Sequence, residues 1–143
     1  MTAPATRPIT DGLFTWPSDE PHLIGGECAA CGTVGFPLRP SCAKCGGADM
    51  RERLLSREGT LWTWTTQGFL PKAPYAGSET VENFQAYALG YVELPGEVRV
   101  ETRLTENDPE RLRIGMKMQL VVVPFRTEPD GTQVVSYAFA PVE

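Results

Sequence analysis

Two cysteine pairs in the stretch CAACGTVGFPLRPSCAKCGG (28–47) constrain this chain more than any other feature. Cys28 and Cys31 form one C-x-x-C pair, Cys42 and Cys45 form the other, and a glycine follows each pair. Two such turns can place four thiolates around a Zn²⁺ ion, each about 2.3 Å from the metal. Glycine supplies the left-handed backbone that a tight turn of this kind needs. The spacing predicts a pair of metal-binding knuckles, with a disulfide as the alternative.

The predicted metal site is structural rather than catalytic. A catalytic zinc keeps a coordination position open for water, whereas four cysteines fill the shell here. The single histidine, His22, precedes Cys28 in the N-terminal segment and is expected to pack or to face solvent. Iron in a rubredoxin-like electron carrier takes the same four thiolates, so that function class stays open from the residues alone.

Length and composition favour a soluble, globular protein of one domain or two very small ones. The 143 residues are 41% hydrophobic and 22% charged, as is usual for globular chains. No apolar run approaches the roughly 18 residues of a membrane span, and residues 1–21 lack the apolar segment of a secretory signal. We therefore expect a cytoplasmic protein with no membrane partner, in which thiols stay reduced and available to a metal.

The rest of the chain has the alternating pattern of β-strands. Strands are expected over 59–67, 84–94, 97–104, 116–125 and 132–141. The turn Pro95-Gly96 joins the second and third as a hairpin. One short helix, capped by Asn107 or Asp108 and ended by Gly115, lies between the third and fourth. This arrangement predicts a closed five-stranded barrel of the OB type, with an open sheet or half-sandwich as the alternative.

Three of these strands also predict which side chains are buried. In the first, Trp62 and Trp64 share a face and are expected in the core. In the second, Ala88 and Gly90 lie on a face of small residues, which lets another backbone approach closely. In the third, alternate positions form the core face: Val98, Val100, Thr102 and Leu104.

The cysteine pairs and the strand pattern divide the chain into three parts. Residues 1–21 are expected to form an arm with one helical turn after Asp11. Residues 22–50 form the zinc ribbon, which is too small to bury a sufficient core without its metal. Residues 56–143 form the barrel, and DMRERLLSRE joins the two. The predicted fold class is mainly β.

The order of these features resembles the DUF35 family, in which a rubredoxin-like zinc ribbon precedes an acyl-CoA-associated OB-fold. The resemblance rests on LIGGECAACGTVGFPLRPSCAKCGG, SREGTLWTWTT, YALGYVELPGEVRV and LRIGMKMQLVVVPF, which together cover nearly the whole chain. Ala43 stands where the family usually has proline after the third cysteine, which hardly matters to ligation. The arm looks shortened and broken by prolines, so the family's N-terminal packing is not assumed.

The resemblance implies a helper protein with a structural zinc rather than an enzyme that acts alone. Members are similar to small subunits of thiolase-superfamily enzymes, including thiolases and lipid-transfer-protein-like aldolases that cleave steroid or aromatic acyl-CoA side chains. It implies a hetero-oligomer on a dimeric thiolase core, in which the partner supplies the nucleophile and bases. In some members the small subunit is also expected to help frame the CoA channel.

The residues themselves agree with a non-catalytic role. Acyl transfer needs a nucleophile with a base in reach, and the metal is expected to take all four cysteines. The rival class is a single-stranded nucleic-acid-binding module, because OB-folds use exposed aromatic side chains to stack bases. A net charge of −5 argues against it, since phosphate binding needs a basic groove. The candidates for a local basic patch are Arg51, Arg53, Arg57 and Lys72.

The stretch GFLPKAPYAGSETVEN (68–83) is long for a hairpin connection, which commonly takes about 2–5 residues. The loop between the first two strands of an OB-fold commonly helps to build its binding surface. We expect a partner enzyme or CoA to contact Phe69, Leu70, Pro71, Lys72 and Tyr75. Within this set, Lys72 is placed to meet a CoA phosphate. The alternative is that the loop folds back over the barrel or the ribbon as a satellite core.

Overall fold

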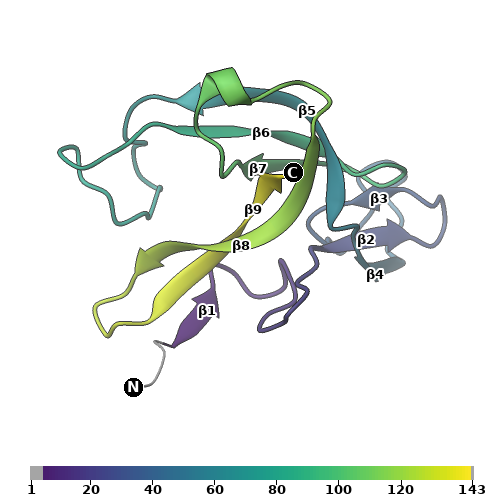
Figure 1. The fold of residues 1–143 in the computed structure, drawn as a ribbon. Coiled ribbons are helices and arrows are strands. Elements are labelled where there is room, and N and C mark those ends of the chain that lie inside the picture. The colour runs from purple at the N-terminus through teal and green to yellow at the C-terminus, as the bar shows by residue number, and fades with distance from the viewer. Residues whose placement is uncertain (1–4, 143) are drawn as a thin grey trace.

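A computed structural model describes residues 5–142 of the chain. Within this range the elements are β1 (Thr6–Pro8), β2 (Ile24–Cys28), β3 (Val34–Gly35), β4 (Met50–Leu54), β5 (Glu58–Gln67), β6 (Tyr87–Glu93), β7 (Arg99–Arg103), the 3₁₀ helix η1 (Pro109–Arg111), β8 (Lys117–Thr127) and β9 (Gln133–Pro141). They form a six-stranded sheet in the order β1-β9-β8-β5-β6-β7 and a three-stranded sheet in the order β3-β2-β4. Figure 1 shows the larger sheet curling around itself, with the smaller sheet beside it. No helix in residues 5–142 is long and apolar enough to cross a membrane.

The larger sheet forms the predicted OB-type barrel. β5, β6 and β7 form a meander, β8 returns to pair with β5, and β9 pairs with β8. A parallel bridge between Leu104 and Phe139 closes the seam between β7 and β9, and the Thr105 amide donates to the Phe139 carbonyl at 3.0 Å. The helix η1 lies between β7 and β8, where Asp108 caps it by accepting from the Glu110 amide. The mainly β fold, the five barrel strands and the short helix are confirmed.

The N-terminal arm contains a strand and no helix in its described part. β1 pairs in parallel with the first half of β9. Asp11 lies in a turn, after which Phe14 is buried and forms an antiparallel bridge with Leu23. The helical turn predicted after Asp11 is therefore wrong. The reason is that β9 leaves part of its edge unpaired beyond the seam, and the arm satisfies those backbone groups.

Strand β5 breaks its alternation at Trp62. Leu61 is buried and Trp64 packs against the core, but Trp62 is 45% exposed. The pairing with β6 shifts register between Leu61 and Thr63, and such a bulge re-aims the side chains around it. The prediction that both tryptophans share a core face is therefore wrong for Trp62.

The face predictions for β6 and β7 are confirmed. Ala88 and Gly90 are buried, and a Cβ atom at Gly90 would collide with the carbonyl oxygen of Thr63. The small side chains therefore allow β5 and β6 to approach closely. Of the four predicted core positions, Val100 and Thr102 on β7 and Leu104 directly after it are buried, and Val98 directly before it is half-buried against the core.

One hydrophobic core fills the barrel and reaches the zinc ribbon. Its largest fully buried side chains are Phe139, Leu23, Leu55, Leu61, Leu94, Met118, Leu120, Val92 and Val100. Leu23 lies directly before β2 and Leu55 directly after β4. The chain therefore enters and leaves the ribbon through the core that it shares with the barrel.

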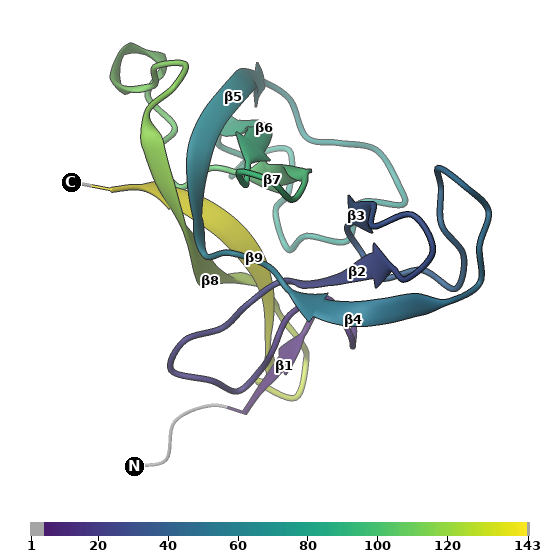
Figure 2. The same cartoon turned by 90° about the vertical axis from the view of Figure 1, so that its right-hand side faces the viewer.

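The ribbon sheet extends into the segment that was expected to join the two parts. β2 pairs with β4 from Ile24 opposite Leu54 to Cys28 opposite Met50. Figure 2 shows β2, β3 and β4 grouped on one side of the barrel, with β1 alongside β9. Arg53 on β4 donates to the Glu97 carboxylate at 2.9 Å, which fixes the ribbon against the turn between β6 and β7.

Candidate metal centre, loop and groove

The four predicted metal ligands come together in one cluster. The Sγ atoms of Cys28, Cys31, Cys42 and Cys45 all lie within 4.8 Å of one another. The Cys28–Cys45 and Cys31–Cys42 sulfur pairs are 3.6 and 3.7 Å apart. A tetrahedron with Zn–S bonds of about 2.3 Å has sulfur–sulfur edges of about 3.8 Å, whereas a disulfide needs about 2.0 Å. The spacing therefore fits a tetrahedral metal site, and all four thiols are free of disulfides.

The two knuckles share one backbone design. The Gly32 amide donates to the Cys28 carbonyl at 2.8 Å, and the Gly46 amide donates to the Cys42 carbonyl at 2.9 Å. Both glycines have positive φ angles, 77° and 75°, which residues with a side chain rarely adopt. The glycine after each pair thus lets the chain turn tightly enough for both sulfurs to face one point.

Hydrogen bonds favour the thiolate form at two of the four cysteines, Cys31 and Cys42. The Cys45 and Lys44 amides lie 3.5 and 3.4 Å from Cys42 Sγ, and these hydrogen bonds lower the pKa of the Cys42 thiol. Hydrogen bonds with the side chain and backbone of Thr33 lower the pKa of the Cys31 thiol to about 6. Because metals bind the thiolate form, the surroundings of Cys31 and Cys42 support ligation. At Cys45 a hydrogen bond from the Gly47 amide lowers the pKa, but the thiols of Cys28, Cys31 and Cys42 outweigh it and raise the pKa of Cys45 to about 11.

The cluster has the character of a structural zinc site. Protein sulfurs fill a complete four-ligand shell, so no position remains for water or substrate. The Nδ1 atom of His22 lies 2.8 Å from the Leu55 carbonyl oxygen, so this histidine joins the arm to the ribbon–barrel junction. This contact agrees with the expectation that His22 packs or faces solvent.

The exposed part of the β5–β6 loop is its apolar apex. Phe69 is 72% exposed, and Lys72 is also exposed. Leu70 and Pro71 are half-buried between them. Four of the five predicted contact residues therefore lie together in a stretch whose largest apolar side chain faces solvent.

Tyr75, the fifth predicted contact residue, packs on the barrel instead. Its ring meets Phe125 edge-on with centroids 5.7 Å apart. Its hydroxyl donates to Glu79 at 2.8 Å and accepts from Arg103 at 2.7 Å. Burial, followed by the hydrogen bond to Glu79, raises the pKa of Tyr75. The loop thus combines satellite packing at Tyr75 with an exposed apex at Phe69.

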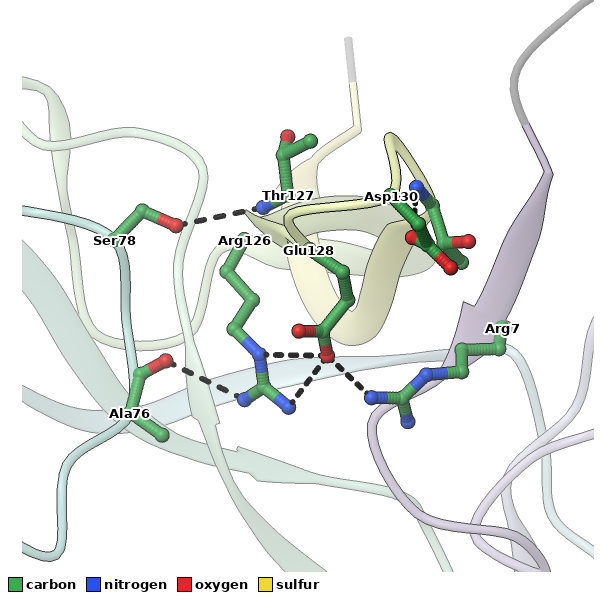
Figure 3. Close-up of polar contacts among 8 residues, drawn as sticks. Arg7, Ala76, Ser78, Arg126, Thr127, Glu128 and Asp130 are labelled. Atoms are coloured by element: carbon green, nitrogen blue, oxygen red, sulfur yellow. Dashed lines mark hydrogen bonds and ion pairs between the residues drawn. The ribbon is translucent and has the colours of Figure 1, made fainter.

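A carboxylate on the β8–β9 connection anchors the same loop and the N-terminal strand (Figure 3). Glu128 pairs with Arg126 at 3.2 Å and with Arg7 of β1. Arg126 also donates to the Ala76 carbonyl at 3.3 Å. The two guanidinium groups, Arg126 first and then Arg7, hold the pKa of Glu128 below its usual value. The loop, the hairpin and β1 are therefore joined at one corner of the barrel.

Sequence reasoning missed a groove of about 300 Å³ beside the β7–β9 seam. Its lining includes Leu89, Arg103, Phe125, Ser136 and Tyr137. The alternation of β6 and β7 places Leu89 and Arg103 on the outer face, and this was readable from the sequence. The contribution of β8 and β9 was not, because it depends on how the barrel closes.

The β5 bulge creates a second aromatic surface. The Trp62 and Tyr91 rings meet edge-on with centroids 6.1 Å apart, and Arg99 lies 4.0 Å from the Trp62 centroid. Trp, Tyr and Arg are the residue types most enriched among those that dominate binding energy at protein interfaces. This surface therefore has the composition of an interface.

Three of the four basic residues considered for nucleic-acid binding make polar contacts within the chain. Arg53 pairs with Glu97, as described above, and Arg57 donates to the Pro21 carbonyl at 2.9 Å. Arg51 lies 3.7 Å from the Asp49 carboxylate. Arg53 and Arg57 are therefore engaged within the chain, whereas Arg51 and Lys72 are exposed, and nucleic-acid binding stays an untested alternative.

Comparison with known protein families agrees with this architecture. The profile of the ChsH2 rubredoxin-like zinc ribbon domain matches residues 16–51. The profile of the ChsH2 C-terminal OB-fold domain matches residues 52–123. The chain belongs to the ChsH2 (DUF35) family. The zinc ribbon, the OB-fold and the family resemblance seen in the sequence are thus confirmed.

Relatives within the family are named as scaffolds or subunits. A DUF35 domain-containing scaffold protein of Pyrococcus furiosus is 33% identical over 122 residues, which are 85% of this chain and 84% of that protein. The benzoylsuccinyl-CoA thiolase subunit BbsA of Thauera aromatica is 32% identical over 129 residues, covering 89% and 83%. A chain in the solved structure of an Ltp2-ChsH2(DUF35) aldolase matches with a TM-score of 0.60 and 25% identity, covering 84% of both chains. The similarity therefore extends over both the ribbon and the barrel.

Proposed function

We propose that this chain is a non-catalytic accessory subunit that binds and supports a thiolase-like or lipid-transfer-protein-like aldolase acting on acyl-CoA thioesters. The observation that carries the proposal is the similarity, over more than four fifths of each relative, to a DUF35 scaffold protein and to a thiolase subunit. The match to a chain of an aldolase structure supports the same reading.

The side chains of the described residues support a role without chemistry of its own. Acyl transfer and carbon–carbon cleavage need a nucleophile with a base in reach. The four thiols of residues 5–142 belong to the metal cluster, and the ring of His22 contacts a backbone carbonyl. The partner enzyme therefore supplies the nucleophile and base.

The proposed contact with the partner is the apex of the β5–β6 loop. Phe69 is the anchor because it is large, apolar and exposed, and Leu70 and Pro71 extend its surface. Tyr75 contributes by holding the loop on the barrel through Arg103 and Phe125. Lys72 is exposed three residues after Phe69 in the same loop, and we expect it to meet a CoA phosphate where the loop frames the entrance to the CoA channel.

The proposed assembly is a hetero-oligomer built on a dimeric thiolase-superfamily core. The substrate class is an acyl-CoA, with steroid or aromatic side chains as the predicted acyl groups. The name of one relative includes benzoylsuccinyl-CoA thiolase. The benzoyl group in that name is the reason to test aromatic acyl groups with this chain.

Affinity purification of the tagged, zinc-loaded chain from its source cells tests this function. The expected result is stoichiometric recovery of a thiolase-superfamily enzyme, identified by mass spectrometry. Recovery of that enzyme should fall when the bait carries Phe69→Ser. A bait that retains nucleic acid and no acyl-CoA enzyme would contradict the proposal.

A further inference from the structure

Two arginines on the outer face of β7 have similar aromatic neighbours and different charge partners. Arg99 lies 4.0 Å from the Trp62 ring centroid, and Arg103 lies 3.6 Å from that of Tyr87. Arg99 is paired with the Glu93 carboxylate at 2.8 Å. For Arg103, no carboxylate among residues 5–142 lies within ion-pair distance, and its guanidinium donates to the neutral hydroxyl of Tyr75.

The position of the Arg103 guanidinium is fixed before any ligand arrives. It stacks on Tyr87, and its central carbon is 5.7 and 5.6 Å from the ring centroids of Tyr75 and Phe125. The hydrogen bond to the Tyr75 hydroxyl is 2.7 Å long. Stacking covers one face of a guanidinium but leaves N–H groups at its edge, which can bind an oxyanion in a fork geometry. A preorganised donor of this kind loses little entropy on binding.

The groove beside Arg103 has apolar walls and a floor that crosses the seam. Leu89, Val123 and Phe125 contribute apolar surface to it. The Tyr137 hydroxyl donates to the Glu101 carbonyl at 3.0 Å and so joins β9 to β7. Burial raises the pKa of Tyr137, so this phenol stays neutral and does not repel an anion. Glu101 is the one acidic residue that lines the groove in the described part of the chain.

We propose that this groove binds a small organic carboxylate with a flat apolar body, whose carboxylate pairs with Arg103 and whose body lies against Leu89, Val123 and Phe125. A planar carboxylate matches the guanidinium fork through two parallel hydrogen bonds. The volume of about 300 Å³ is at the lower end of the range for small-molecule pockets. The site is complete within this chain, so the proposal does not depend on the proposed partner.

Isothermal titration of the zinc-loaded chain with 2-naphthoate tests the site, with the neutral 2-naphthamide and inorganic phosphate as comparison ligands. Naphthoate should bind, and both comparison ligands should bind at least about tenfold more weakly, because each lacks one half of the interaction. Equal binding of naphthamide would overturn the role of Arg103. Equal binding of phosphate would overturn the role of the apolar walls.

Matched variants locate the binding. Arg103→Gln should weaken naphthoate binding by about 10–100-fold, as expected for a lost charged hydrogen bond, while Arg99→Gln on the same strand should leave it unchanged. Glu101→Gln, which keeps every Arg103 contact, should strengthen binding severalfold. Absence of naphthoate binding, equal losses in the two arginine variants, or unchanged affinity in Glu101→Gln would each overturn the proposal.

Discussion

The zinc ribbon and the barrel are stabilised by different means. Between β2 and β4 the buried side chains include only Cys28 and Cys42 among the residues described, whereas the barrel buries a continuous set of aliphatic side chains around Phe139. In the ribbon, where Val34 and Phe36 are only partly buried against the barrel core, metal ligation is therefore expected to supply most of the stability. The chain therefore joins a unit that depends on its metal to a unit that depends on hydrophobic burial. The contacts between the two units include Leu23, Leu55 and Glu97.

Removal of a metal ligand should have the largest effect, because it should unfold the ribbon and leave the barrel folded. Cys42→Ser leaves three thiolates, so zinc should be lost and β2–β4 should unfold while the barrel strands persist. Metal analysis measures the loss of zinc, and amide hydrogen exchange shows which strands unfold. Ala43→Ser, an exposed neighbouring change, is the control and should retain zinc. Stoichiometric zinc in a variant lacking both Cys42 and Cys45 would contradict the four-ligand site.

A change in the barrel core should have the opposite result: the barrel should be destabilised while the ribbon keeps its zinc. Phe139 is fully buried where β7, β8 and β9 meet. Phe139→Ala should reduce the free energy of unfolding by about 3–5 kcal/mol through lost burial and a cavity. Denaturant titration gives this value, and metal analysis in buffer should still find zinc. If zinc release and barrel unfolding share one midpoint in every variant, the two units are not separable.

Changes to exposed side chains of the barrel and of the ribbon should have different effects on affinity for the partner enzyme. Phe69→Ser removes the exposed apex of the barrel loop and should weaken the complex with the partner by about 1–3 kcal/mol if Phe69 is an anchor. Leu54→Ser on β4 removes an exposed apolar side chain of the ribbon and should have little effect. Titration calorimetry of both variants decides the matter. A larger loss from Leu54→Ser would place the interface on the ribbon.

Weakening the polar contact between the ribbon and the barrel should reduce the free energy of unfolding by a moderate amount. The Glu97 side chain is 7% exposed and accepts from Arg53 at 2.9 Å and from the Ser56 amide at 2.8 Å. Glu97→Gln should destabilise the protein by about 1–3 kcal/mol, because it replaces charged hydrogen bonds with neutral ones. Glu93→Gln, at an exposed pair with Arg99, is the matched control and should cost less. Equal losses in denaturant titration would show that Glu97 does not couple the units.

The smallest predicted effect is a pH dependence at the barrel corner. Arg126 and Arg7 hold the pKa of Glu128 below its usual value. A lowered pKa in the folded state gives stability that is present above the unfolded pKa and is lost as pH falls through the folded pKa. The stability difference between the wild type and Glu128→Gln should therefore shrink as the solution is acidified below about pH 4.3. A difference that stays constant with pH would contradict these ion pairs.

The metal ligands could be predicted from the sequence because each knuckle is local. Spacing and the following glycine define the turn before any tertiary contact forms. Trp62 was placed on the wrong face because its bulge depends on the register with β6, which alternation alone cannot show. The arm was misread for a related reason: β1 forms only because β9 has an unpaired edge far away in the chain.

The groove shows where sequence reasoning ends. Tyr87 and Arg103 fall on one outer face by simple alternation, but Phe125 and Tyr137 arrive there through the return of β8 and β9. Likewise, the length of the β5–β6 loop was readable, while the separation of exposed Phe69 from packed Tyr75 was not. Metal ligands and turns can be predicted from local sequence. A surface built from several strands can be described only once the closed barrel is known.

The central claim is that this chain contributes a surface and leaves the chemistry to a partner. The most direct measurement is acyl-CoA turnover by the purified zinc-loaded chain, by its purified partner enzyme and by the reconstituted complex. We expect no turnover by the chain alone and the highest turnover by the complex. Thioester turnover by the partner-free chain that persists through further purification would contradict it.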